Sequence, residues 1–242
     1  INMERLMCIA NKYNLKVIED CAQATGSKWR DKSVGSWGDV GCFSFFPTKN
    51  LGAAGDAGAV TTNDSSIAQK IRELAVHGMP KRYLHSDFGY NSRLDAIQAS
   101  VLNVKLKKLT HWINQREFIA RNYIELLQDI EGIGIPEVDC LLEGRHSWNQ
   151  FVIRVDLSQE NLSSISKKEY SSEENFSIRD WLKDQLVEKG VNTIIYYPIP
   201  IHMQPAYTRF SSLEGKLPVT ERIATEVLSL PIFPEITFDQ QR

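Results

Sequence analysis

The chain has 242 residues, of which 42% are hydrophobic and 24% charged, and its formal net charge is −2. A chain of this length and composition can bury one large or two small hydrophobic cores. A net charge this close to zero gives no electrostatic basis for binding nucleic acid or an anionic membrane, and no apolar run approaches the roughly 20 residues of a spanning helix.

The cysteines and histidines indicate which covalent links and metal sites to expect. Four cysteines are scattered along the chain without a C-x-x-C pair, which predicts reduced thiols and a cytoplasmic protein. The five histidines show no H-x-x-x-H pairing, so the sequence predicts no metal site.

The first predicted elements are a helix over residues 2–13 and a short strand that begins at Leu15. The strand runs into Glu19 and Asp20, with Gln23 three residues further on. A parallel sheet needs strands on both sides of such a unit, and nothing precedes it here. We therefore expect this chain to be the C-terminal piece of a longer protein.

The stretch 39–58, DVGCFSFFPTKNLGAAGDAG, carries the clearest chemical signal. Its apolar start predicts a buried strand that Pro47 ends, because proline has no N–H for a sheet ladder. Lys49 follows at once, before a loop with three glycines in seven residues. Glycines allow backbone to approach a ligand closely, and desolvation favours the neutral amine that Schiff-base chemistry requires.

Asp20 and Lys49 would come from the ends of two strands and meet in one crevice, where open α/β sheets bind ligands. A carboxylate on a pyridinium nitrogen and a lysine on the aldehyde are the two protein groups that a pyridoxal phosphate enzyme needs. The alternative is a lysine that merely extends its ammonium from a strand end into water. A nucleotide-binding loop is disfavoured, because a strand rather than a helix is predicted after the glycines and Asn50 follows the lysine.

The remaining pattern alternates between helices and strands. We predict a strand over 57–62, a helix over 67–76 capped by Asn63 or Asp64, and a functional loop over 77–90. Helical spacing then continues from Ser92 to Leu127, with a break near 107–111 where Thr110 caps the second helix. Later elements are a strand over 148–155, a polar insertion over 158–177, a helix over 178–189, a strand over 191–196 and a helix over 220–228.

Four segments resemble, in this order, the sugar aminotransferases of the DegT/DnrJ/EryC1/StrS family. They are VIEDCAQATG, VGSWGDVGCFSFFPTKNLGAAGDAGAV, HGMPKRYLHSDFGYNSRLDAIQAS and YYPIPIHMQPAY. The resemblance extends from about Leu15 to the end of the chain. It implies pyridoxal 5'-phosphate as cofactor, and a longer enzyme whose first third, with a phosphate loop and a ring-stacking aromatic, is missing here.

The resemblance also assigns roles position by position. Lys49 is similar to the lysine that carries the cofactor covalently, and Asp20 matches the partner of the pyridinium nitrogen. Gln23 matches the side chain beside the ring hydroxyl, and Ser44 matches a phosphate contact. Asn91 matches the asparagine that reaches the phosphate across a dimer interface, which implies a homodimer with a shared active site.

The implied reaction is transfer of an amino group from an amino acid, glutamate in our expectation, to a keto-sugar carried by a nucleoside diphosphate. Thr25 and Tyr196 stand where the family often has histidine, near the expected sugar site, so the sugar stays open. Tyr196, Tyr197 and His202 could line that site or simply pack. Dehydration of a deoxysugar is an alternative reaction within the family. The dehydratases carry histidine in place of the lysine, so Lys49 argues against it. A non-catalytic or regulatory fragment of the same fold is the remaining alternative.

The predicted fold class is α/β, and by resemblance it is the fold type I architecture of pyridoxal phosphate enzymes. Residues 1–109 are expected to form the second part of the large, mainly parallel-sheet domain. Residues 110–242 are expected to form a small α+β domain.

Overall fold

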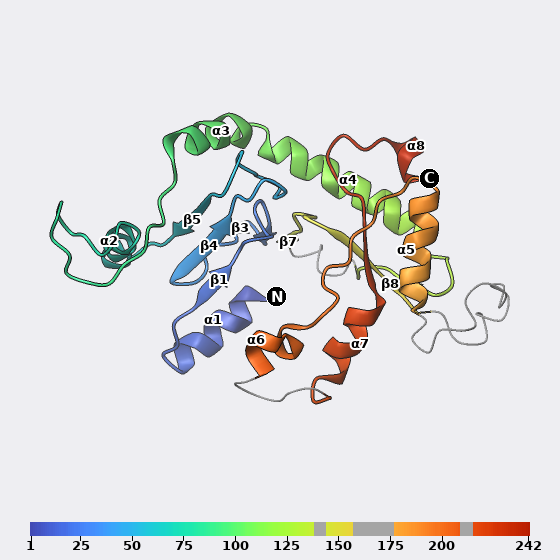
Figure 1. Ribbon diagram of the computed structural model, residues 1–242, viewed down its shortest axis with the longest axis horizontal. Helices are drawn as coiled ribbons and strands as arrows, with labels where there is room; N and C mark the ends of the chain where they lie inside the picture. Colours follow the sequence, from blue (N-terminus) through green and yellow to red (C-terminus); the bar gives the residue numbers. More distant parts are fainter. Residues whose placement is uncertain (138–143, 157–176, 209–214) are drawn as a thin grey trace. The chain divides into compact units, whose positions relative to one another are not determined.

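The computed structural model describes residues 1–137, 144–156, 177–208 and 215–242 (Figure 1). All but the last residue of the predicted polar insertion at 158–177 lies outside these ranges. The described chain forms two compact units. The first contains Ile1–Glu117 and residues 144–149, and the second contains Phe118–Glu137 and the described residues from Gln150 onward.

The division differs from the boundary predicted at residue 109. That position is the junction of two helices, whereas the observed division falls between Glu117 and Phe118, inside the second of them. The reason is that one continuous 19-residue helix contributes its first half to one unit and its second half to the other. Its hydrophobic spacing alone does not reveal this.

The helices of the first unit agree with the predicted spacing. They are α1 (Met3–Lys12), α2 (Ser65–Leu74), α3 (Ala96–Leu106) and the first half of α4 (Leu109–Leu127). Asn2 caps α1 by accepting the Arg5 N–H at 3.0 Å, and Asp64 caps α2 by accepting from Ser66 and Ile67. The break between α3 and α4 lies at 107–108, so Thr110 is within α4 and the predicted Thr110 cap is wrong. The predicted buried face of α2 is only half-buried.

The central sheet of the first unit has the order β1–β4–β5, with bounds Ile18–Asp20, Val40–Ser44 and Gly58–Thr61 (Figure 1). Strands β1 and β4 are parallel, with Asp20 opposite Cys42. Strand β5 is antiparallel to β4, with Gly58 opposite Ser44. The carboxyl ends of β1 and β4 therefore lie at the same edge of the sheet.

A second small sheet forms where the sequence predicts a polar turn segment over 29–38. Strands β2 (Lys28–Trp29) and β3 (Lys32–Ser33) make a hairpin, and β7 (Gly144–Arg145) pairs with the other edge of β2. The polar residues satisfy their backbone groups in this ladder rather than in water, which the composition of the segment does not indicate.

Glu19 fixes the loop that leads from this hairpin into β4. Its carboxylate accepts the N–H groups of Gly35 at 2.8 Å and of Trp37 and Gly38 at 2.7 Å each, and the residue is 9% exposed. Gly35 is required here because its φ is +76°, and a β-carbon would also lie 2.5 Å from the Phe43 ring. Three amide donors on one carboxylate offset the cost of burying its charge.

The core of the first unit lies between the loop after β4 and helix α3. Leu51, Ala53 and Leu102 are each less than 10% exposed, and Phe45 and Leu109 pack against them. Burial of apolar area at roughly 25 cal/mol per Å² makes this contact the main force that holds the loop on the helix.

The second unit contains the antiparallel sheet β6–β8–β9, with bounds Ile133–Gly134, Phe151–Val155 and Val227–Leu230. Its helices are the second half of α4, α5 (Ile178–Glu188), the 3-10 helix η3 (Ile201–Met203), α6 (Pro205–Thr208), α7 (Pro218–Glu226) and α8 (Phe238–Gln241). Phe151 and Leu228 are fully buried, and the Phe151 ring lies 5.0 Å from that of Tyr123. The alternating burial of β8 confirms the strand predicted from WNQFVIRV, although it begins at Phe151.

Two predictions in this unit are wrong. Residues 191–196 form no strand; Ile194 makes only an isolated bridge to Ser229. The helix predicted over 220–228 ends at Glu226, and Val227 begins β9. Both differences arise because residues 227–230, as β9, pair with β8. A local apolar pattern does not show which segment will pair with a given strand.

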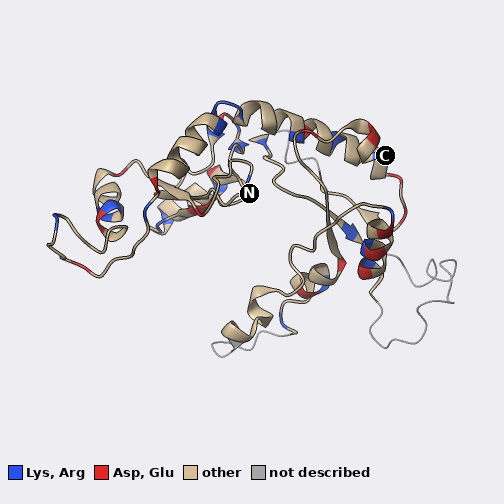
Figure 2. Cartoon of the chain, turned by 45° about the horizontal axis from the view of Figure 1, so that its top comes forward, with Lys and Arg blue, Asp and Glu red and all other residues tan. Residues whose placement is uncertain are grey.

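Charges of both signs are interspersed over each unit (Figure 2). Arg154 of β8 and Glu226 of α7 form an ion pair at 2.6 Å, one of several pairs that cross between elements. No helix in the described residues is long and apolar enough to cross a membrane.

Candidate active site

The parallel pair β1 and β4 brings two of the predicted residues to one edge of the central sheet. Asp20 is the last residue of β1, and Ser44 is the last residue of β4. Because the strands are parallel and neighbouring, both side chains start from the carboxyl-end edge, where α/β sheets bind ligands. Both residues lie in strands as predicted, although β1 begins at Ile18 rather than Leu15 and β4 ends at Ser44 rather than at Pro47. Their roles stay predictions.

Asp20 presents a carboxylate to solvent at this edge. One oxygen, Oδ1, accepts the Ala22 N–H at 3.0 Å, which turns the chain away from the strand. The other oxygen has no hydrogen bond within the part of the chain that the structure describes. The side chain is therefore held in orientation and keeps an acceptor available.

Cys21, the next residue, is not part of this chemistry. It is 2% exposed, and burial raises the pKa of its thiol to about 11, with the charges of Glu19 and Asp20 adding to the effect. A neutral, buried thiol is a packing group rather than a nucleophile.

Lys49 lies in the turn that follows β4. Its N–H donates to the Phe46 carbonyl at 2.9 Å, and the loop returns so that the Ala53 N–H reaches the Phe45 carbonyl at 2.8 Å. The Lys49 side chain is half-buried, and its ammonium makes no hydrogen bond or ion pair with any residue in the described ranges. Its donors are therefore available within these ranges, which fits both a ligand-directed amine and the predicted alternative of an ammonium extended into water; the role of Lys49 stays a prediction.

Helix α3 fixes the far side of the Lys49 loop. The Ala54 N–H donates to Gln98 Oε1 at 2.8 Å, and Lys105 Nζ donates to the Gly52 carbonyl. A β-carbon at Gly52 would lie 2.3 Å from the Pro47 carbonyl oxygen, so only glycine fits there. The loop is rigid because it packs on a helix and closes on its own backbone.

Gln23 lies beside a cavity of about 460 Å³ on the same side of the unit as Asp20. Three residues remote in sequence, Arg145, His146 and Ser147, contribute to its lining. Sequence reasoning missed these residues, because they follow a segment with no motif and come more than 100 positions after Gln23. Lys49, Ser44 and Asn91 do not line this cavity.

Asn91 lies at the end of α2 rather than at this edge of the sheet. It is exposed and makes an isolated bridge with Val76, where the segment 77–91 returns to the end of α2. In Figure 1 this segment extends from α2 away from β1. Its predicted role, contact with the cofactor phosphate in another copy of the chain, stays a prediction.

The two departures from the family pattern differ in their surroundings. Thr25 is 7% exposed, and its hydroxyl has no hydrogen-bond partner in the described residues. Tyr196 and His202 belong to the second unit, where His202 bonds to Glu221 at 3.0 Å. That bond and two backbone N–H groups lower the pKa of the Glu221 carboxyl. His202 therefore has a hydrogen-bond partner within its own unit, and both alternatives given for it stay predictions.

The donor set at the edge fits pyridoxal phosphate. The carboxylate of Asp20 suits a ring nitrogen, the hydroxyl of Ser44 a phosphate and the half-buried amine of Lys49 an aldehyde. Among the described residues, one Asp20 oxygen and the Lys49 amine have no partner. Within the described residues no cluster of three or more metal-ligating side chains occurs.

The family model of the DegT/DnrJ/EryC1/StrS aminotransferases matches residues 1–242. The chain belongs to this family. The fold type I architecture expected from the sequence is thereby confirmed, and aminotransferases of this family depend on pyridoxal phosphate, with a solved member that contains bound PMP.

Three relatives illustrate the range of the family. A "pleiotropic regulatory protein" of Geobacillus stearothermophilus is 42% identical over 100% of this chain and 59% of its own length. A UDP-N-acetyl-3-dehydro-alpha-D-glucosamine 3-aminotransferase of Acidithiobacillus ferrooxidans is 39% identical over 99% and 58%. The crystal structure of Streptomyces venezuelae DesV with a ketimine intermediate is 36% identical, with a TM-score of 0.86 over 100% of this chain and 59% of that one. The chain thus spans less than two thirds of the relatives it matches.

Proposed function

We propose that this chain is the larger part of a pyridoxal phosphate-dependent aminotransferase. Its reaction would be transfer of an amino group from an amino acid, glutamate being our choice, to a keto-sugar linked to a nucleoside diphosphate. The observation that carries the proposal is the half-buried Lys49, which has no partner among the described residues and lies one turn beyond a strand whose parallel neighbour ends in Asp20. The nucleotide-sugar transaminases among its relatives support the substrate class.

Each residue has a chemical task in this proposal. Lys49 holds the cofactor through its amine, and the released amine moves the α-proton of the donor as a general acid and base. Asp20 keeps a proton on the ring nitrogen through its free oxygen. Ser44 donates to the phosphate, and Gln23 lies beside the ring hydroxyl. When bound, pyridoxal phosphate supplies the electron sink that stabilises negative charge at the α-carbon.

The proposed assembly is a homodimer with a shared active site. The segment 77–91 supports it, because this segment leads away from the Lys49 loop and can present Asn91 to a second copy. Glutamate and the nucleotide-sugar would then bind where two copies meet.

The test is covalent capture of the cofactor. Purified chain is incubated with pyridoxal phosphate, reduced with borohydride and digested, and the labelled peptide is mapped. We expect the label on the peptide that contains Pro47-Thr48-Lys49-Asn50, and an absorbance band that Lys49→Ala abolishes. The control is Lys107→Ala, an exposed lysine at the end of α3. Label on another lysine, with Lys49 unmodified, would end the assignment.

A regulatory role is the second candidate, favoured by the relative described as a pleiotropic regulatory protein. The same capture experiment separates the two when it is followed by addition of glutamate. In an aminotransferase, the Lys49-dependent absorbance band should decrease as glutamate reacts with the cofactor. A regulator that retains the cofactor only as a ligand leaves the band unchanged.

A further inference from the structure

The segment 145–148 is hydrogen-bonded to both parts of the chain that carry the proposed catalytic residues. Asn50, which follows Lys49 directly, donates its Nδ2–H to the Ser147 carbonyl at 2.7 Å. The Ser147 hydroxyl donates to the Gln23 carbonyl at 3.2 Å. Ser147 is 1% exposed and Asn50 is 7% exposed, so water does not compete for either bond.

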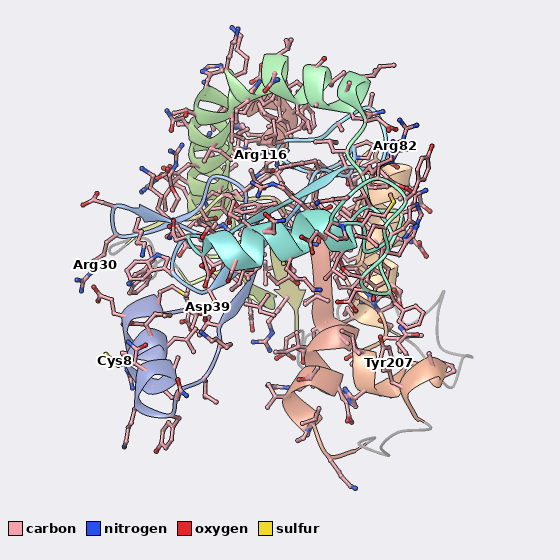
Figure 3. All side chains as sticks on the ribbon, turned by 90° about the vertical axis from the view of Figure 1, so that its left-hand side faces the viewer. Cys8, Arg30, Asp39, Arg82, Arg116 and Tyr207 are labelled. Carbon is pink, nitrogen blue, oxygen red and sulfur yellow. The ribbon has the colours of Figure 1, made fainter. Side chains whose placement is uncertain are left out.

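The segment that makes this connection is itself held by a bond from α4 and by a bond between two of its own residues. Arg116 of α4, 8% exposed, donates from Nη1 to the Trp148 carbonyl at 3.0 Å, and Figure 3 shows it among the packed side chains next to α4. The Trp148 N–H donates to His146 Nδ1 at 3.0 Å, and the two rings meet edge to face at 4.4 Å. Because the segment is constrained, the Ser147 carbonyl has a fixed position, and the Lys49 loop can be positioned by a hydrogen bond to it.

The Lys49 loop needs such a fixed point at its lysine end. The hydrogen bonds from Ala54 and Lys105 hold its far side on α3. The register of β1 and β4 places Asp20 and Ser44, but Lys49 comes five residues after the strand has ended. At this end of the loop, Asn50 supplies the side-chain bond that reaches out of the loop.

We propose that Asn50 and Ser147 are positioning residues, which together hold Lys49 at a fixed offset from the Asp20–Gln23 segment. The inference rests on the proposed function, since it explains how an amine and a carboxylate could be kept at opposite ends of one ring. A displacement of about 1 Å of a reacting group can reduce a rate about a hundredfold. Supporting contacts of this kind are therefore as necessary as the reacting groups.

The test compares variants that remove each bond. Asn50→Leu keeps the size of the side chain but cannot donate, and Ser147→Ala removes the hydroxyl, whereas Ser147→Thr keeps it. At limiting pyridoxal phosphate, we expect each deletion to reduce borohydride labelling of Lys49 roughly fivefold to tenfold, as loss of one buried hydrogen bond implies. Ser147→Thr should retain most of the labelling. The double variant should lose little more than either single variant, because one broken link already disconnects the two segments.

Two controls separate positioning from a general loss of stability. Asn103→Leu makes the same chemical change at an exposed site of α3. Tyr123→Phe removes one bond from a buried side chain to a backbone carbonyl, here that of Pro231 at 2.9 Å, in the other unit. Both should label at Lys49 like the unmodified chain, even where Tyr123→Phe lowers the unfolding midpoint by as much as Ser147→Ala.

Hydrogen exchange tests the two bonds of Asn50 and Ser147, which we call the brace, without any cofactor. Backbone amides at 49–52 should exchange several times faster in Asn50→Leu and Ser147→Ala than in the unmodified chain, and those of α3 should not change. If the unmodified chain gives no label at Lys49, the proposed function fails, and this exchange measurement still decides the brace. Unchanged exchange at 49–52 in both variants, or labelling losses that multiply in the double variant, would overturn it.

Discussion

At the scale of single residues, the site depends on which polar atoms already have partners. Asp20 uses one carboxylate oxygen in a bond to its own chain and keeps the other available. Glu19, one residue earlier, uses its carboxylate on three backbone N–H groups. Adjacent side chains in a strand point to opposite faces, so Glu19 can hold the loop before β4 while Asp20 stays available for its proposed role.

The variant Asp20→Asn tests this division. Asparagine can still accept the Ala22 N–H, so the fold and most of the cofactor binding should persist. It cannot act as an anion, so we expect exchange of the α-hydrogen of glutamate in D2O to fall on the order of 100-fold or more. The measurement is proton NMR of glutamate with the chain and pyridoxal phosphate.

The matched control is Asp31→Asn, an exposed aspartate in the β2–β3 turn. It should exchange at the rate of the unmodified chain. Equal rates for Asp20→Asn and Asp31→Asn would show that Asp20 has only a structural role.

At the scale of elements, the loop after β4 is specified by packing more than by its own sequence. Leu51 and Ala53 are buried against Leu102 of α3, and Gly52 between them presses against the Pro47 carbonyl. The glycines of this loop are therefore not equivalent. One is required by a backbone contact, and another faces only the end of a flexible side chain.

We expect Gly52→Ala to lower stability by about 1–3 kcal/mol, as overpacking does, and to reduce labelling of Lys49. Its β-carbon would lie 2.3 Å from the Pro47 oxygen and 3.0 Å from that of Phe46, and neither backbone atom can rotate away. Thermal unfolding and borohydride labelling of the same samples measure both effects.

Gly55→Ala is the control in the same loop. Its nearest neighbour would be Gln98 Nε2 at 3.1 Å, at the end of a flexible side chain. This variant should unfold within about 1 kcal/mol of the unmodified chain. If the two alanine variants were equally stable, the close packing inferred at Gly52 would be incorrect.

At the scale of the whole molecule, the first unit exposes many large apolar side chains between residues 83 and 106. Phe88 is 99% exposed, Ile97 76%, Tyr90 72% and Val104 69%. Large apolar side chains exposed in such number are commonly buried by association. Obligate dimer interfaces bury more than about 2,000 Å².

We therefore expect the chain to associate at micromolar concentration. Sedimentation should give a mass above the 27.6 kDa of one chain, and Phe88→Ser combined with Ile97→Ser should shift the population toward that value. The control is Phe118→Ser, an exposed apolar residue of the other unit. A monodisperse monomer of the unmodified chain across this range would contradict both the dimer and the assignment of Asn91.

Local signals in the sequence predicted much of this protein. A strand begins at Val40 although it ends at Ser44 before Pro47 is reached, Asp64 caps its helix, and Asp20 ends a strand. These features could be predicted because they depend on neighbours within a few residues. The family could be predicted for the same reason, since its motifs are continuous stretches that keep their order.

The tertiary structure alone decided how these pieces meet. Strand pairing depends on which sheet edges are still unpaired once the chain is compact. This determined that β5 runs antiparallel to β4, that β7 pairs with β2, and that β9 rather than 191–196 pairs with β8. The bonds from Asn50 to Ser147 and from Ser147 to Gln23 join residues 97 and 124 positions apart. Such bonds leave no periodic or compositional trace in the sequence, because each partner would look the same locally if it faced water.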